Sequence, residues 1–105
     1  MTVQVQVRGE GLAVIGELDM ASADDFRDFA KRVIDPTREV VLNIVDLAFV
    51  DTSGVRAILG LAETACPNGV VLGWPPNNVL RTLEILAVER VPGIRIQRRS
   101  EEAPS

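Results

Sequence analysis

The sequence predicts an α/β domain whose mixed β-sheet has about five strands, with helices packed mainly on one face. Three observations point to this class. Apolar and polar residues alternate near the N-terminus, as in a half-buried strand. Further along, short β-branched runs alternate with stretches of helical periodicity. Hydrophobic residues make up 47% of the chain and aromatic residues only 4%, so the core is built from aliphatic side chains.

The first elements are a hairpin and a helix. Residues 3–8 form an alternating strand, and residues 12–15 form a second strand that pairs antiparallel with it across a glycine-containing turn. Ser22 is the candidate N-cap of the following helix, and aspartates suit its first turn. The apolar residues of this helix recur at helical spacing up to the break at residues 35–36: Phe26, Phe29, Ala30 and Val33.

The middle of the chain predicts the centre of the sheet. Residues 40–45 are a continuous, β-branched apolar run, which is typical of a strand covered on both faces. We therefore expect this strand at the centre, with the helices after Gly16 and Gly54 on one face. Residues 46–50 are expected to form the exit loop. A helix then continues to Cys66, carried by apolar residues at helical spacing: Val55, Ile58, Leu59 and Ala62.

The last third of the chain predicts two strands and a helix. Residues 70–74 form a strand that two prolines end, because proline cannot continue a β-ladder. Asn77 or Asn78 is expected to cap a helix that runs to residue 86. Residues 94–97 form a short final strand.

Length and charge limit the organisation of the chain and its partners. With 105 residues we expect a single domain over 1–105, with an ordered core at about 3–97 and a flexible tail at 98–105. The net charge of −4 disfavours nucleic acid and anionic membrane surfaces, which would repel the chain. There is no signal-peptide pattern, and no apolar run approaches the ~20 residues that span a bilayer. A soluble, cytoplasmic protein is therefore expected.

The residue types present exclude several kinds of catalytic site. The chain has no histidine, which excludes Ser-His-Asp and Cys-His triads and histidine-based metal sites. A Gly-rich phosphate loop is also missing. The single cysteine, Cys66, cannot form an internal disulfide. We interpret it as a small apolar residue near a helix end. We therefore expect no enzyme activity, no cofactor and no metal ion.

The segment Asp51-Thr52-Ser53-Gly54 is the most informative about function. It lies between a buried strand and a helix, at the sheet edge where open α/β sheets bind ligands and partners. Aspartate, threonine and serine can all cap a helix, so a well-formed N-cap accounts for the segment without any further role. Two adjacent hydroxyls at a helix N-terminus are also suited to accept a phosphoryl group, because the helix end tolerates negative charge.

Two motifs in this sequence resemble the signature of STAS domains, particularly the bacterial anti-sigma-factor antagonists. The first is residues 45–59, VDLAFVDTSGVRAIL, in which Asp-Leu and a few loop residues precede Asp-Ser/Thr-Ser/Thr-Gly at the start of a helix. The second is Gly16-Glu17-Leu18-Asp19 followed by Ala21-Ser22-Ala23, which is similar to the family's Gly-Glu-Leu-Asp element. With the order of elements, the resemblance extends from about Val3 to Gln97.

The resemblance implies a STAS-like fold and a function in transcription regulation by partner switching. The implied partner is an anti-sigma-factor kinase, which would itself bind ATP and Mg²⁺. The implied phosphorylation site is Thr52, with Ser53 as the fallback, although most antagonists resemble Asp-Ser here. Leu86-Ala87-Val88 also departs from the Thr-Gly-Leu of many relatives. The implied partner-binding residues lie in two loops: Asp19, Met20, Asp51, Thr52, Ser53, Gly54, Val55 and Arg56.

Several of these residues can also be explained by a purely structural role. A second function is also compatible with the sequence. Asp19 can be a loop carboxylate near a helix start, Arg56 a solvated helix residue, and Trp74 a core or groove-lining side chain. The alternative function is a non-enzymatic STAS subunit that regulates or assembles a lipid ABC transport complex, since the Asp-Thr at this loop resembles such proteins. Monomer and weak dimer are both left open.

Overall fold

The computed structural model describes residues 3–9, 11–65 and 67–99. Glu10 of the predicted turn, Cys66, and residues 100–105 of the predicted tail lie outside them. The described residues form six strands, three α-helices and one short 3₁₀ helix, in the order β1 (Val3–Arg8), β2 (Gly11–Leu18), α1 (Ala23–Val33), β3 (Val40–Asn43), β4 (Leu47–Val50), α2 (Thr52–Thr64), β5 (Val70–Gly73), α3 (Asn77–Ile85), η1 (Val88–Arg90) and β6 (Ile94–Gln97).

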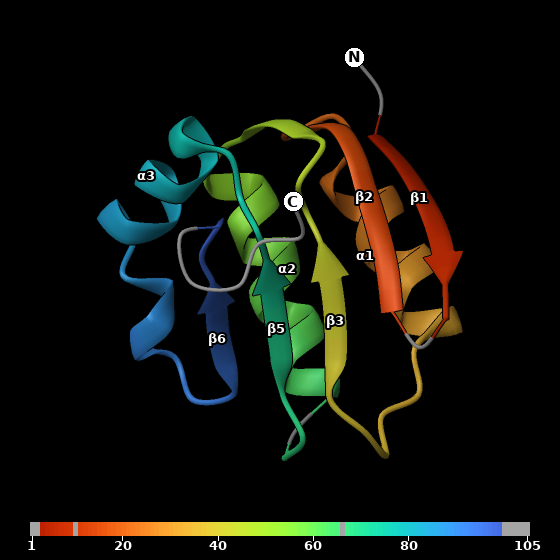
Figure 1. Cartoon of the computed structure of the whole chain (residues 1–105). Helices are drawn as coiled ribbons and strands as arrows, with labels where there is room; N and C mark the ends of the chain where they lie inside the picture. The colour runs from red at the N-terminus through yellow and green to blue at the C-terminus, as the bar shows by residue number, and fades with distance from the viewer. Residues whose placement is uncertain (1–2, 10, 66, 100–105) are drawn as a thin grey trace.

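The strands form one mixed sheet in the order β1-β2-β3-β5-β6 (Figure 1). The hairpin β1–β2 is antiparallel, and β2, β3, β5 and β6 are parallel to one another. The prediction of a mixed sheet with residues 40–45 at its centre is confirmed, since β3 lies between β2 and β5. The strand ends earlier than predicted, at Asn43, where the side-chain Oδ1 accepts the N–H of Val45 at 3.0 Å.

The prediction that residues 46–50 form a loop is wrong. Leu47–Val50 is the strand β4, which pairs in parallel with the last residues of β2. Its two end residues, Leu47 and Val50, are buried in the core, and this burial holds the segment against the sheet. The same pairing extends β2 to Leu18, three residues beyond the predicted end at 15.

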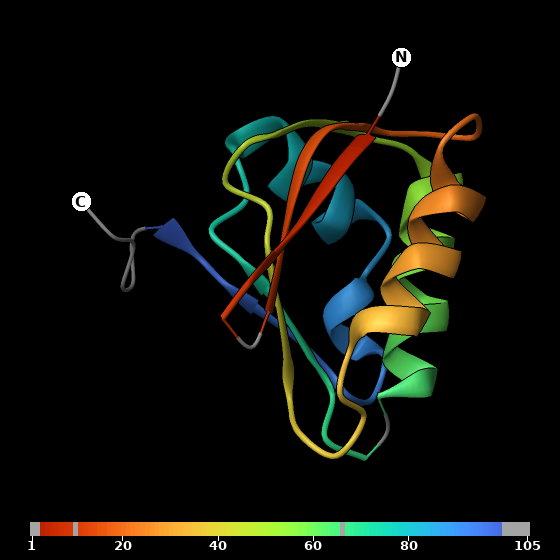
Figure 2. The same cartoon turned by 90° about the vertical axis from the view of Figure 1, so that its right-hand side faces the viewer.

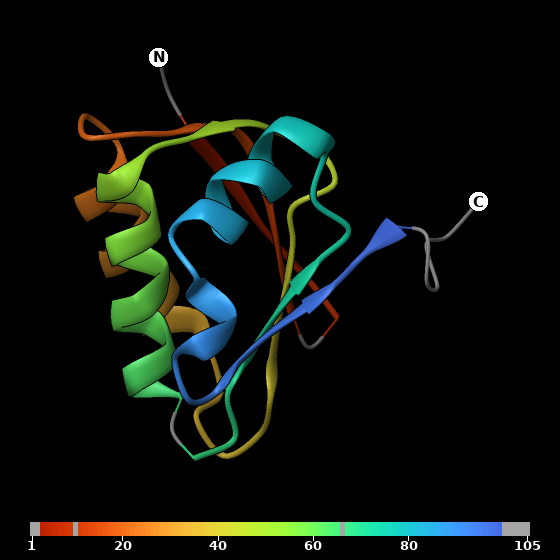
Figure 3. The same cartoon turned by 90° about the vertical axis from the view of Figure 1, so that its left-hand side faces the viewer.

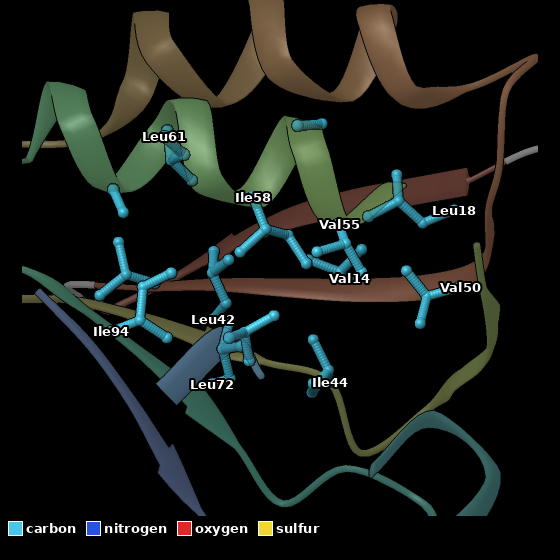
Figure 4. Close-up of a cluster of buried hydrophobic side chains, with 14 of the residues drawn as sticks. Val14, Leu18, Leu42, Ile44, Val50, Val55, Ile58, Leu61, Leu72 and Ile94 are labelled. Atoms are coloured by element: carbon cyan, nitrogen blue, oxygen red, sulfur yellow. The ribbon is translucent and has the colours of Figure 1, made fainter. Parts of the chain in front are cut away.

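The helices lie on one face of the sheet and leave the other face uncovered (Figures 2 and 3). This confirms the predicted layering. The core between the two layers is aliphatic, as the composition predicted. Figure 4 shows Leu42 and Leu72 of the sheet below Ile58 and Leu61 of α2.

The predicted helix caps differ from the observed ones. Ser22 does occupy the N-cap position of α1, but its side chain makes no capping hydrogen bond. Pro76 precedes α3, so Asn77 and Asn78 are its first residues and the predicted asparagine cap is wrong. Asn78 instead donates its Nδ2 hydrogen to the carbonyl oxygen of Ala48 at 2.8 Å, which ties α3 to β4.

Arg98, the residue after β6, forms ion pairs with α3 and η1, the two helices that precede this strand in the chain. Its guanidinium lies 2.6 Å from Glu89 of η1 and 3.4 Å from Glu84 of α3. The hydrogen bond from Arg98 lowers the pKa of Glu89 below its ordinary value of 4.5. Because the unfolded chain then binds more protons, this carboxylate contributes stability above pH 4.5 and loses it as the pH falls through the lowered pKa.

We therefore expect Arg98→Gln to lower the free energy of unfolding by about 1 kcal/mol or less at pH 7, since the pair is partly solvated. The difference from wild type should shrink as the pH falls from 7 towards 3, because the charge of Glu89 is lost as the pH passes through its lowered pKa. Urea unfolding at the two pH values measures it. Arg81→Gln, at an exposed position of α3, is the control. An equal loss at both pH values would mean that packing of the arginine stem, not the ion pair, carries the effect.

Candidate functional site

Asp51 caps helix α2 and ties its start to the sheet. The backbone of Asp51 is extended, and its Oδ1 accepts the N–H of Gly54 at 3.0 Å. Its own N–H donates to the carbonyl oxygen of Leu18 at 3.2 Å. Of the three residues that could cap this helix, the structure therefore uses the aspartate. The hydroxyls of the two residues that follow take no part in the cap.

Gly54 is the point of closest approach between α2 and β2. A Cβ at this position would press on the carbonyl oxygen of Leu18 and lie 2.8 Å from Cγ2 of Val50. Both contacts are closer than real Cβ atoms allow, and one of them is with backbone. The glycine of the motif thus lets the helix start lie directly against the sheet.

The two hydroxyls differ in exposure. Thr52 is exposed as the first residue of α2, and Ser53 is half-buried. Neither hydroxyl makes a hydrogen bond within the described part of the chain. Arg56, one turn further on, is exposed and has no ion pair with any described residue. Among the described residues, the helix start therefore carries two hydroxyls without a hydrogen bond, one exposed and one half-buried, and an exposed cation without an ion pair.

The loop before α1 is organised by Asp19. Its Oδ1 accepts the backbone N–H groups of Ala21 at 3.0 Å and Ser22 at 3.2 Å. The hydroxyl of Ser22 donates to the carbonyl oxygen of Glu17 at 3.0 Å. The bonds to Asp19 show that it organises the loop before the helix, which is the structural one of the two roles that the sequence suggested. They also hold Met20 at the tip of the turn, where its side chain is 78% exposed.

The two loops meet in one groove between the starts of α1 and α2. The groove has a volume of about 230 Å³, and its lining includes Met20 and Arg27 on one side and Ser53 and Arg56 on the other. The structure thus brings together three residues of the predicted partner-binding set. Two others, Gly54 and Val55, are buried and shape the site from below.

Two residues of this region were not predicted. Arg27 lines the groove and pairs with Asp24 at 3.3 Å. Phe49 lies on β4, two residues before Asp51, and remains 44% exposed. Nothing in the sequence indicated a role for Arg27 other than its position on the polar side of a helix. Phe49 lay in a segment expected to be a loop, although an aromatic residue beside the motif was a visible cue.

The arrangement is suited to docking. An exposed methionine, an exposed phenylalanine and arginines close to hydroxyls are typical of protein interfaces. Within residues 3–9, 11–65 and 67–99, no group of three or more His, Cys, Asp or Glu side chains could hold a metal ion. None of the helices in this part of the chain is long and apolar enough to cross a membrane.

Solved structures of anti-sigma factor antagonists have a similar fold. SpoIIAA in its unphosphorylated form is 18% identical, with a TM-score of 0.67 over 94% of this chain and 90% of that one. The phosphorylated form from Bacillus has a TM-score of 0.59 at 18% identity, over 94% of each chain. An antagonist from Mycobacterium paratuberculosis is 17% identical, with a TM-score of 0.67 over 89% of this chain and 83% of its own.

A part of a membrane protein is also similar. The murine anion transporter Slc26a9 matches 88% of this chain with 17% of its own length, at 22% identity and a TM-score of 0.55. At these identities the structures show a shared fold. A search of curated protein sequences found no match. The model of the STAS domain matches residues 2–103, nearly the whole sequence. The chain therefore belongs to the STAS domain family.

Proposed function

We propose that this protein is an anti-sigma-factor antagonist of the bacterial cytoplasm, which binds an anti-sigma-factor kinase and is switched off by phosphorylation of Thr52. Ser53 is the fallback acceptor. The observation that carries the proposal is the position of Thr52: an exposed hydroxyl at the start of α2, next in the chain to Ser53, which lines the same groove as Met20. The existence of SpoIIAA in phosphorylated and unphosphorylated forms supports a switch in a protein of this fold.

The proposed mechanism needs no catalytic group in this chain. The kinase would supply ATP and Mg²⁺ and transfer the phosphoryl group to the hydroxyl. Asp51 is occupied in capping Gly54, so it stays beside the new phosphate and repels it. Attraction by the helix dipole, about 0.3–1 kcal/mol, offsets part of that repulsion. The fold therefore tolerates the phosphate, whereas an interface that must desolvate a dianion does not.

Pull-down from native lysate, followed by mass spectrometry, identifies the partner. The partner is then mixed with ATP and with wild type, Thr52→Ala or Ser53→Ala, and the added mass is mapped to a peptide. We expect one phosphate on Thr52, which Thr52→Ala abolishes and Ser53→Ala leaves in place.

Two other results would change the proposal. Phosphate on Ser53 alone would move the acceptor by one residue. No phosphate on either residue, together with stable binding to a transport ATPase, would favour the non-enzymatic subunit of a lipid ABC transport complex.

A further inference from the structure

The uncovered face of the sheet carries a hollow of about 240 Å³, lined by residues from three strands and the loop after β5: Arg8, Gly11, Leu12, Val41, Asn43 and Trp74. Figure 1 views the sheet from this side, with the helices behind it. Val41 and Asn43 face the hollow because they alternate along β3 with the core residue Leu42. The hollow therefore lies across the sheet from the helix layer.

Trp74 has an unusual conformation at the edge of this hollow. Its φ is +58°, in the left-handed region that bulky residues rarely adopt. Leu72 points into the core, so regular alternation would send residue 74 there too, and the left-handed backbone turns the ring to the other face instead. The backbone is fixed there by bonds from its N–H to Gln97 at 2.7 Å and from Arg99 to its carbonyl oxygen at 3.1 Å.

The indole of Trp74 also lacks a hydrogen-bond partner. Its Nε1 atom is buried and donates to no acceptor. A buried donor without an acceptor is rare in folded proteins and costs stability. Residues with backbone strain cluster at functional sites such as ligand clamps, and Trp74 combines such strain with an unsatisfied donor.

The other polar groups around the hollow are donors as well. Asn43 uses its Oδ1 to accept the N–H of Val45, and its Nδ2 hydrogens make no hydrogen bond with a described residue. The Arg8 guanidinium donates to Oε1 of Gln6 at 2.7 Å and keeps further N–H groups. Among the described residues, no carboxylate lines the hollow. A donor-rich, positively charged pocket with an aromatic wall complements a flat anion.

We propose that this hollow binds a small planar carboxylate, an aromatic acid, with its ring against Trp74 and its carboxylate on Arg8 and Asn43. Nε1 is covered in the unliganded chain, so the indole must turn for Nε1 to donate to an oxygen of the ligand. The volume is below that of typical drug-sized pockets, about 300 Å³ or more, so a single ring is the expected size. This role is separate from the docking surface at Thr52.

The chain has one tryptophan and no tyrosine, so a single indole N–H signal in a ¹H–¹⁵N spectrum reports on this site alone. We expect benzoate to shift that signal saturably, and benzamidine, the same ring with a cationic group, to leave it unchanged. Arg8→Gln should weaken benzoate binding about tenfold, the value of one charge-assisted hydrogen bond. Asn43→Asp, which keeps an acceptor for Val45, should weaken it at least as much through repulsion.

Arg81→Gln, an exposed charge removal on α3, is the matched control and should bind benzoate like wild type. The backbone signals of each variant show whether it is folded. Three results would each overturn the proposal: no saturable shift with benzoate, equal binding by benzoate and benzamidine, or an Arg8→Gln affinity equal to that of Arg81→Gln. The comparison of the two ligands uses wild-type protein alone, so it holds even if a variant fails to fold.

Discussion

Gly54→Ala is expected to lower the free energy of unfolding by about 3 kcal/mol, among the largest effects of adding one methyl group. The new Cβ would press on the carbonyl oxygen of Leu18 and lie 2.8 Å from Val50 Cγ2. That oxygen also accepts the N–H of Asp51, so β2 cannot move away without breaking the bond that anchors the start of α2. Urea unfolding followed by circular dichroism measures the loss.

The matched control lies in the same helix. A Cβ at Gly60 would meet only Cδ of Arg27, at an ordinary contact distance of 3.6 Å. Gly60→Ala is therefore expected to stabilise the protein by about 0.5–1 kcal/mol, because alanine favours the helix over glycine. If Gly54→Ala were as stable as Gly60→Ala, the motif glycine would not be needed for the approach of α2 to the sheet.

The parts of the fold that were predicted correctly leave a local signature in the sequence. The first strand is encoded by strict alternation, and the central strand by a β-branched apolar run that is typical of a strand covered on both faces. β4 was missed because its partner is the end of β2, far away in the chain. The four residues of β4 are too few to show a period of two, and only the pairing with β2 identifies the strand.

In the candidate site, too, features encoded by neighbouring residues could be predicted, and features set by packing between distant segments could not. Residue types limited the cap of α2 to an aspartate or one of two hydroxyl residues, and the structure shows that Asp51 is the cap. The nearness of Met20 to Ser53 follows from the resemblance to STAS domains. Arg27 enters the groove only through the packing of α1 beside α2, which no local pattern encodes. Trp74 was expected in the core or along a groove. Its left-handed backbone, which turns the ring to the open face, cannot be read from a sequence in which the residue is not glycine.

The second large effect is expected on partner binding, and it rests on the proposed docking role of the α2 start. Thr52→Asp should raise the dissociation constant for the kinase about a hundredfold, because a charge desolvated at an interface without a matching cation costs several kcal/mol. The free energy of unfolding should change by about 0.5 kcal/mol or less, since Thr52 is exposed and a helix N-terminus favours an anion. Binding should therefore fall while the fold is preserved.

Thr52→Asn separates charge from shape in this experiment. Asparagine is nearly isosteric with aspartate and neutral, so this variant should bind the kinase within about tenfold of wild type. Titration calorimetry gives the affinities, and urea unfolding gives the stabilities. Equal affinities of Thr52→Asp and Thr52→Asn would show that negative charge at residue 52 is not what opposes docking. A loss confined to the aspartate, at unchanged stability, is the result that an electrostatic switch on the exposed end of α2 requires.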